Sequence, residues 1–270
     1  MMKIGLGEIR PWTFRSLCLI LGGFGLLAPL RAIRLQSAIP KKEIGPLFLV
    51  AFFNITGWHL CSAYGLIYMN AGRAAIIAYT MPVWASLLGT ILLRERLIPS
   101  RVIGLGLGMA ALAILIGPEI KGLGSAPLGV VFMLGAAISW GAGTVFIKYF
   151  RWTIPTLSLS GWQLILGGIP VVLGAFILEP VSALSQVSWR GGWATAYVVI
   201  LGNIFCNWAW IKVVQLFPAS VAAIGTLLIP VVGVFSSALI LGELIGLQEI
   251  AALILMLMAL TIVMIRPKHF

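Results

Sequence analysis

Nine apolar segments follow one another along this chain, and they constrain its fold more than any other feature. A helix needs about 20 apolar residues to cross the hydrocarbon core of a bilayer, where it satisfies its own backbone hydrogen bonds. Because 61% of the residues are hydrophobic and only 9% are charged, a water-soluble fold could not bury the apolar surface. No alternating β-barrel pattern is present. We predict an all-α integral membrane protein, a polytopic helical bundle with spans at 12–30, 46–69, 72–93, 100–117, 127–149, 155–178, 192–214, 219–241 and 247–265.

The net charge of +11 is also typical of nucleic-acid-binding proteins, but here the basic residues lie in short loops between apolar runs. We interpret them as charges that orient the chain in the bilayer, and we expect no nucleic-acid partner. With a cytoplasmic C-terminus, twelve basic residues lie on the cytoplasmic side and six on the other side. This bias predicts a multi-pass protein of the cell inner (cytoplasmic) membrane whose C-terminus is cytoplasmic.

Residues that bind metals or act as nucleophiles are few and scattered. Cys18, Cys61 and Cys206 lie far apart inside apolar runs, and we predict that they are buried small hydrophobic residues. The chain has two histidines and no Asp, and it contains neither HExxH nor GxSxG. We therefore expect no metal, no cofactor and no catalytic residue. The start, MMKIGLGEIRPW, has no apolar stretch typical of a signal peptide.

Much of the sequence occurs twice. The stretch Ala74–Leu97 aligns with Ala222–Ile245, so that Pro82 falls on Pro230 and Glu95 on Glu243, each at an offset of 148 residues. Further upstream, LILGG occurs at 19–23 and again at 164–168, an offset of 145 residues. Matches in the same order at a nearly constant offset indicate an internal duplication.

The duplication predicts two domains, a first repeat at 1–122 with four helices and a second repeat at 123–270 with five. At an offset of 145, the helix at 127–149 would need a counterpart before residue 1. Either a first helix was lost in evolution or the sequence starts too late, and we favour the second interpretation. The parent protein would then have ten spans in a 5+5 arrangement. Because five is odd, the two repeats would cross the bilayer in opposite senses, as in many alternating-access transporters.

Three motifs resemble EamA-domain proteins of the drug/metabolite transporter superfamily. The stretch SWGAGTVFIK resembles the first-helix signature of that family, and YTMPVWASLLGTILLRERL and TLLIPVVGVFSSALILGELI resemble its fourth-helix pattern. The resemblance covers nearly the whole chain, which departs from the family pattern by lacking a Trp-Gly helix in its first half. It implies a ten-helix inverted repeat that exports small metabolites. The Trp-rich, carboxylate-poor character is most similar to exporters of aromatic and other neutral amino acids.

Polar side chains inside the spans are the candidates for a substrate-binding site, because polar groups are costly in the membrane and usually face the bundle interior. His59 has Asn207 as its repeat mate at an offset of 148, so the two could flank one central cavity. Asn54 and Trp58 share a helix face, as do Asn203 and Asn207. Ordinary interhelical hydrogen bonds are the alternative for each of them.

Four further residues complete the candidate set. Trp140 lies in the middle of its span and offers a rigid face for stacking or for a cation–π contact. Tyr79 precedes Pro82 by three residues, and Pro82 and Pro230 could bend their helices and free a carbonyl toward the cavity. Plain packing and tolerated kinks are the alternatives. Glu95 and Glu243 close their helices, which favours a structural role.

No carboxylate lies deep in any predicted span, which favours facilitated diffusion over coupling to an ion. The resemblance to the EamA-domain proteins implies export of small metabolites, amino acids above all, and we predict that it occurs by alternating access around a cavity between two inverted repeats. A membrane scaffold or regulatory subunit, a channel and, less well, an intramembrane enzyme are the alternatives. The sequence leaves the substrate, the direction of transport, the energy source and the oligomeric state open.

Overall fold

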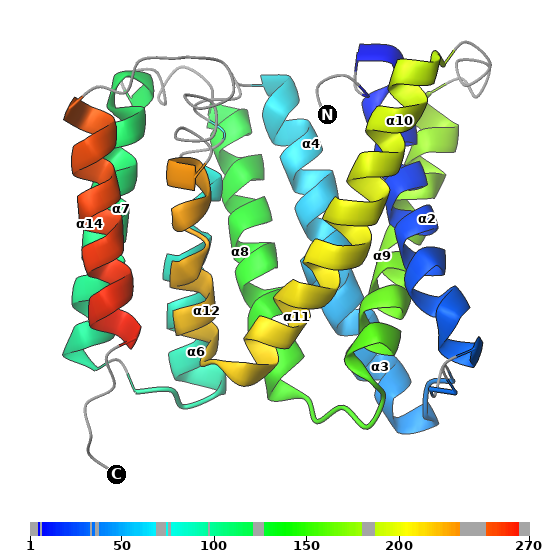
Figure 1. Cartoon of the computed structure of the whole chain (residues 1–270), viewed down its shortest axis with the longest axis horizontal. Helices are drawn as coiled ribbons and strands as arrows, with labels where there is room; N and C mark the ends of the chain where they lie inside the picture. Colours follow the sequence, from blue (N-terminus) through cyan, green and yellow to red (C-terminus); the bar gives the residue numbers. More distant parts are fainter. Residues whose placement is uncertain are drawn as a thin grey trace. The chain divides into compact units, whose positions relative to one another are not determined.

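The computed structural model describes residues 5, 7–32, 34–35, 38–68, 74, 77–96, 98–120, 127–179, 187–232 and 247–264, and within them it contains helices and no strand (Figure 1). This confirms the predicted all-helical class. The helices in chain order are α2 (Pro11–Ala32), α3 (Lys41–Ala51), η1 (Phe52–Gly57), α4 (Trp58–Tyr68), α6 (Met81–Leu92), α7 (Pro99–Ile120), α8 (Pro127–Tyr149), α9 (Thr156–Leu178), α10 (Trp189–Tyr197), η4 (Val198–Cys206), α11 (Asn207–Leu216), α12 (Ala219–Gly225) and α14 (Leu247–Met264).

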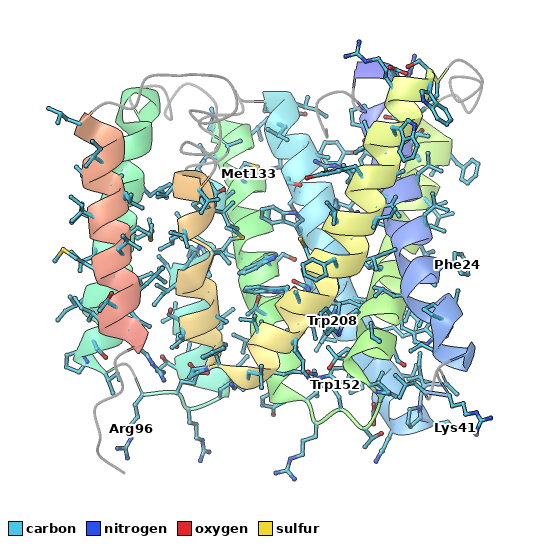
Figure 2. The ribbon with its side chains drawn as sticks, in the orientation of Figure 1. Phe24, Lys41, Arg96, Met133, Trp152 and Trp208 are labelled. Carbon is cyan, nitrogen blue, oxygen red and sulfur yellow. The ribbon has the colours of Figure 1, made fainter. Side chains whose placement is uncertain are left out.

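Most of the described chain lies in apolar helices at the predicted positions, and the side chains that these helices carry are drawn in Figure 2. Five stretches are long and apolar enough to cross a membrane, namely Pro11–Leu30, Lys41–Tyr68, Pro127–Tyr149, Thr156–Leu178 and Trp189–Leu216. Shorter apolar helices occupy the other predicted spans, at Met81–Leu92, Pro99–Ile114, Ala219–Val232 and Ile250–Val263. Each predicted span therefore contains an apolar helix, and the chain is a polytopic helical membrane protein.

The span predicted at 72–93 is interrupted by a turn. Tyr79 and Thr80 form this turn, and α6 begins immediately after it. Pro82 therefore lies in the first turn of α6, where its missing N–H group costs nothing because no intrahelical acceptor is available there. The Thr80 hydroxyl donates to the Ile77 carbonyl at 2.6 Å and stabilises the turn. The kink that we predicted at Pro82 is thus a helix break two residues earlier.

The second repeat also has a helix break just before its proline. Thr226 and Leu227 form a turn after α12, and a helical stretch at 228–232 follows, with Pro230 as its third residue. The Thr226 hydroxyl donates to the carbonyl of Ala223 at 2.7 Å, again three residues earlier. A proline within the first turn of the new helix requires no backbone donor. Both copies therefore break their helix in the same way just before the proline.

The chain folds into two compact units, each of which contains segments from both halves of the sequence. Unit 1 comprises 1–63 and 146–216, and unit 2 comprises 64–145 and 217–270. Each unit brings together helices that are far apart in the sequence.

In unit 1, α2 and α9 pack side by side and run in opposite directions (Figure 1). Small residues permit this close approach, since a Cβ atom on Gly23 would lie 3.0 Å from the carbonyl oxygen of Gly161. A Cβ atom on Gly161 would in turn lie 3.1 Å from the Gly23 carbonyl oxygen. Such contacts between small residues are a main source of helix association in lipid, where no hydrophobic effect drives helices together.

The contacts of two further glycines show the internal symmetry of unit 1. A Cβ atom on Gly22 of α2 would lie 2.6 Å from the Cβ atom of Asn203 in η4. A Cβ atom on Gly167 of α9 would lie 2.5 Å from the Cβ atom of Ile55 in η1. Gly167 follows Gly22 by 145 residues and Asn203 follows Ile55 by 148 residues. The two contacts are therefore repeat mates, and the segments that carry them run in opposite directions in Figure 1.

Two hydrogen-bonded pairs at opposite ends of unit 1 obey the same relation. Ser188 donates to the Glu8 carboxylate through its backbone N–H at 2.7 Å and through its hydroxyl at 2.7 Å. Thr153 donates to the Glu43 carboxylate through its backbone N–H at 3.0 Å and through its hydroxyl. Thr153 follows Glu8 by 145 residues, as Ser188 follows Glu43. Acid and hydroxyl are exchanged between the two copies, which an inverted repeat allows.

Unit 2 is also built on close glycine contacts. A Cβ atom on Gly141 of α8 would lie 3.0 Å from the backbone nitrogen of Ala85 in α6. Gly104 of α7 lies equally close to α14, because a Cβ atom there would be 3.1 Å from the Ala259 carbonyl oxygen. Helices α7 and α14 and the segment 227–232 together form a core cluster of buried apolar residues, Ala111, Leu112, Leu227, Val231, Ala252 and Met256.

Candidate functional site

Two π-helical segments occupy equivalent places in the two repeats. Adding 148 residues to η1 (Phe52–Gly57) gives 200–205, which lies inside η4 (Val198–Cys206). Asn54 belongs to the first segment and Asn203 to the second. π-helices are rare and occur frequently at functional sites. The sequence does not predict these two segments, because no residue type in either of them specifies a π-helix.

Asn54 forms a polar pair with a residue that the sequence analysis missed. Its Nδ2 atom donates to Oε1 of Gln163 on α9 at 2.8 Å, which joins the first repeat to the second inside unit 1. Gln163 is fully buried and Asn54 is 5% exposed. Because the pair shares a single hydrogen bond, Asn54 Oδ1 and Gln163 Nε2 remain buried without a partner among the described residues.

The fold does not require this polar pair. Its repeat mates are Gly202 at an offset of 148 from Asn54 and Cys18 at an offset of 145 from Gln163. The second copy thus has a small residue and an apolar residue at the equivalent places. A buried amide is costly unless it is hydrogen-bonded, so its presence in one copy alone suggests a purpose other than folding.

His59 lies on α4 directly after the π-helical segment and is linked to α2. The Nη1 atom of Arg15 donates to the His59 carbonyl oxygen at 2.6 Å and to Ser62 Oγ at 3.3 Å. His59 Nδ1 is buried and has no partner in the described part of the chain. The sequence indicates His59 as a candidate, but nothing in it distinguishes Arg15 from the other basic residues that orient the chain.

The other polar candidates of unit 1 lie in the second repeat and beside η1. Asn203 Nδ2 donates to the Val198 carbonyl oxygen at 3.3 Å, within η4. Asn207 is half-buried at the start of α11, and its Oδ1 atom lacks a partner among the described residues. Trp58 is half-buried and follows η1 directly. Unit 1 therefore contains His59, Asn54, Trp58, Asn203 and Asn207.

The remaining candidates belong to unit 2. Trp140 is half-buried on α8, and Thr144 donates its hydroxyl proton to the Trp140 carbonyl oxygen at 3.0 Å. Tyr79 packs against the apolar core cluster of this unit. Pro82 is buried and Pro230 is half-buried. A cavity shared by Trp140 and the polar residues of unit 1 remains a prediction.

Carboxylates lie at helix ends, where they bind the start of another segment. Glu95 accepts hydrogen bonds from the backbone N–H of Ala219 at 2.8 Å and from the hydroxyl of Ser220 at 2.7 Å. The carboxylate also forms an ion pair with Arg101 at 3.3 Å. The side chain thus complements the positive end of α12. Its repeat mate Glu243 lies outside the described residues.

Unit 1 contains three such carboxylates, all outside the sequence-based candidate set. Glu179 accepts from the backbone N–H groups of Trp12 and Thr13 at 3.0 and 2.8 Å, at the start of α2. Glu43 and Glu8 bind Thr153 and Ser188, as described above. The hydrogen bonds from Ser188 stabilise the ionised form of Glu8 and lower its pKa from the ordinary value of 4.5. In all three contacts, a Ser or Thr just before a helix or in its first turn donates its hydroxyl to the carboxylate.

A cavity of about 250 Å³ lies between α2 and α9, lined by residues that include Leu17, Ile20, Val172 and Phe176. Its hydroxyl groups are already engaged, since Ser16 donates to the Trp12 carbonyl oxygen at 2.8 Å. The lining offers a polar substrate little to bind, and none of the predicted site residues belongs to it. Within the described residues, no group of three or more His, Cys or Glu side chains could hold a metal ion.

The apolar helices and the polar side chains buried within them are typical of a polytopic membrane protein. A sequence model of the EamA-like transporter family matches residues 1–117 and 127–265. The chain belongs to the EamA-like transporter family.

Relatives and a solved structure agree with this assignment. The transporter YoaV of Bacillus subtilis is 26% identical over 243 residues, which cover 90% of this chain and 83% of the relative. A protein of Escherichia coli named a probable amino-acid metabolite efflux pump is 29% identical over 264 residues, which cover 94% of this chain and 86% of the relative. A crystal structure with 19% sequence identity has a TM-score of 0.84 and covers 96% of this chain and 89% of its own chain, which shows a common fold.

Proposed function

We propose that the protein exports amino acids or closely related small metabolites by alternating access between its two inverted repeats. The substrate would bind polar side chains that the repeats hold inside the membrane, Asn54, His59, Asn203 and Asn207 together with Trp58. Trp140 and Tyr79 would wall the same path, and the breaks before Pro82 and Pro230 would allow the helices to move.

One observation carries this proposal. Unit 1 holds buried polar atoms without a partner among the described residues on three different spans: Asn54 Oδ1, His59 Nδ1, Gln163 Nε2 and Asn207 Oδ1. A buried donor or acceptor that is left unsatisfied costs about 1–3 kcal/mol. A zwitterionic substrate has both donors and acceptors and would satisfy such groups as it passes. A scaffold that only packs against other proteins would have no use for them.

The names of two relatives support the substrate class. The Escherichia coli and Salmonella typhimurium relatives are named probable amino-acid metabolite efflux pumps and are 29% and 26% identical to this chain. The hydrogen bonds of four carboxylates support passive transport. Each accepts from the start of another segment instead of facing a substrate path, and the four are Glu8, Glu43, Glu95 and Glu179. We therefore propose facilitated diffusion down the gradient of the substrate.

Transport by purified protein in proteoliposomes tests the proposal. Labelled neutral and aromatic amino acids should show saturable uptake, and unlabelled amino acid trapped inside should accelerate it by counterflow. Uptake should persist when the proton gradient is collapsed. Empty liposomes serve as the control. Folded protein that moves none of the 20 amino acids would overturn the proposal, and uptake without saturation or counterflow would indicate a channel.

The orientation is a separate part of the proposal. We place the protein in the inner membrane with a cytoplasmic C-terminus, because this arrangement gives the larger number of basic residues to the cytoplasm. A fluorescent protein that folds only in the cytoplasm, fused after Phe270, should fluoresce, whereas an alkaline phosphatase fused there should be inactive. The opposite pair of results would reverse the assigned orientation.

A further inference from the structure

The Arg15 side chain turns into unit 1 instead of toward water. Arg15 lies four residues into α2, about 6 Å from the start of the helix. A basic residue so close to a helix end ordinarily extends its charge to the membrane surface. Arg15 is instead half-buried and donates to the His59 carbonyl oxygen at 2.6 Å and to Ser62 Oγ at 3.3 Å on α4.

The guanidinium has spare hydrogen-bonding capacity. Both contacts use Nη1, and no carboxylate within the described residues lies at ion-pair distance from Arg15. The other guanidinium nitrogens are not among the buried polar atoms that lack a partner, so they keep some exposed surface. A charge held in a membrane protein without a counter-ion is expensive and is therefore a candidate for a functional site.

The equivalent place in the second repeat holds an uncharged residue. The repeat mate of Arg15 is Ser160 on α9, at an offset of 145 residues. The Ser160 hydroxyl donates to the Thr156 carbonyl oxygen within its own helix at 2.8 Å. The equivalent place in the second copy thus carries no charge and makes no interhelical bond through that hydroxyl. If Arg15 served folding alone, this role would exist in the first repeat and be absent from the second.

We propose that Arg15 binds the carboxylate of the transported amino acid, with Ser62 and His59 beside it. This inference rests on the proposed function and names the chemical group that the site recognises. A guanidinium presents parallel N–H groups that match the two oxygens of a carboxylate. The contacts of Nη1 with α4 fix the orientation of the side chain, which leaves the other nitrogens for the substrate. Arg15 therefore determines specificity for amino acids over analogues that lack the carboxylate.

Analogues that differ only in the carboxylate test the inference. Counterflow in proteoliposomes is measured with phenylalanine, phenylalaninamide and phenethylamine, and in parallel with leucine, leucinamide and isopentylamine. The wild type should prefer each acid over its amide and its amine by at least about tenfold in apparent affinity, because a charge-assisted hydrogen bond is lost with the carboxylate. Thermal stabilisation of the detergent-solubilised protein by the same compounds gives a binding readout that does not depend on transport.

Three variants distinguish recognition from folding. Arg15→Gln keeps a donor for the His59 carbonyl but removes the charge, so it should abolish the preference for acids by raising their half-saturation concentration alone. Arg15→Lys keeps the charge without the planar fork and should retain part of the preference. Arg10→Gln removes an exposed positive charge just before α2 and should leave the preference unchanged.

Each outcome decides a different point. Equal handling of acid and amide by the wild type would overturn the role of Arg15 and leave the proposed function in place. A loss of affinity for all three analogues in Arg15→Gln would show that Arg15 only positions α4, and would also overturn the inference. If no amino acid is moved, the proposed function fails. Stabilisation of the wild type by acids but not of Arg15→Gln would still support carboxylate binding, and stabilisation by none of the compounds would overturn it.

Discussion

The side chain of Asn54 donates to that of Gln163 at 2.8 Å, and this single bond joins a π-helical segment of one repeat to helix α9 of the other. Both amides retain one polar atom without a partner among the described residues. The pair therefore stabilises the contact between the repeats less than two fully satisfied amides would. A substrate-binding site must exchange hydrogen bonds within the protein for hydrogen bonds to the substrate. A pair of amides that is only partly satisfied fits this requirement.

Replacing one member of this pair should destabilise the protein more than replacing both. Asn54→Ala removes the donor to Gln163 Oε1, so that the whole Gln163 amide is left buried without a partner among the described residues, at a cost of about 1–3 kcal/mol. The double variant Asn54→Leu with Gln163→Leu removes both amides and should recover part of that loss. Thermal unfolding of the purified variants measures the two effects.

The same variants separate stability from transport. If the pair serves the substrate, the double variant should be nearly as stable as the wild type and yet transport poorly. Cys18 and Gly202, the repeat mates of the pair, show that small and apolar residues are tolerated at such positions. Normal transport by a stable double variant would remove both residues from the substrate path.

Glycine contacts in unit 1 should tolerate no side chain. Gly167→Ala would place a Cβ atom 2.8 Å from the Ala51 carbonyl oxygen, and a backbone atom cannot move aside as a flexible side chain can. We expect a loss of about 1–3 kcal/mol from the resulting strain, measured by thermal unfolding in detergent. The distance between α9 and the α3–η1 segment would have to increase.

Gly45→Ala is the matched control for that substitution. Gly45 lies inside α3, and a Cβ atom there would meet nothing within 4 Å. Alanine favours a helix by about 0.5–1 kcal/mol relative to glycine, so this variant should be as stable as the wild type or slightly more stable. A similar loss of stability in both variants would show that the close approach at Gly167 is not what matters.

The sequence predicted the spans because hydrophobic length is a local property. The two repeats stay a prediction, and the offsets of 145 and 148 residues, found from LILGG and the two prolines, give the contact of Gly22 with Asn203 and the contact of Gly167 with Ile55 equivalent positions in them. The partners of the polar residues could not be predicted in this way. Gln163 and Arg15 become candidates only through their contacts with the helices packed against them. The π-helical segments could not be predicted either, because no residue type specifies a π-helix.

The turns at Tyr79 and Thr226 show another limit. An apolar run with a proline in it is compatible with a kinked continuous helix and with a broken one. In the structure the helix is broken in each copy. The hydroxyl of Thr80 or Thr226 donates to the carbonyl three residues earlier and stabilises the turn. Such side-chain bonds compete with the helix, but threonine occurs too often in membrane helices for this to be a reliable sequence signal.

The Glu8–Ser188 contact should make stability depend on pH. The hydrogen bonds from Ser188 lower the pKa of Glu8 in the folded protein below the ordinary value of 4.5. The contribution is fully present above that ordinary value and is lost as the pH falls through the lower, folded pKa. Glu8→Gln should therefore flatten this part of the pH dependence of thermal unfolding between pH 5 and the acid limit, which is roughly where a carboxylate titrates.

Ser188→Ala provides the control for this prediction. It removes the hydroxyl donor at 2.7 Å but leaves the backbone donor, so the pKa of Glu8 should rise only part of the way toward its ordinary value. The pH dependence should then lie between those of the wild type and Glu8→Gln. An unchanged profile in both variants would mean that this contact does not contribute to stability.

Glu95 should contribute more to the stability of unit 2 than its ion pair with Arg101 alone provides. The carboxylate accepts from the backbone N–H of Ala219 and from the hydroxyl of Ser220 as well as from Arg101, and its side chain is only 10% exposed. Glu95→Gln removes the charge from all three bonds, so we expect a loss of about 1–3 kcal/mol in thermal unfolding. Arg101→Gln breaks only the partly exposed ion pair and should cost about 1 kcal/mol or less. A larger effect for Arg101→Gln than for Glu95→Gln would contradict the assignment of Glu95 as the residue that binds the start of α12, and would instead make the charge of Arg101 the important feature of this helix end.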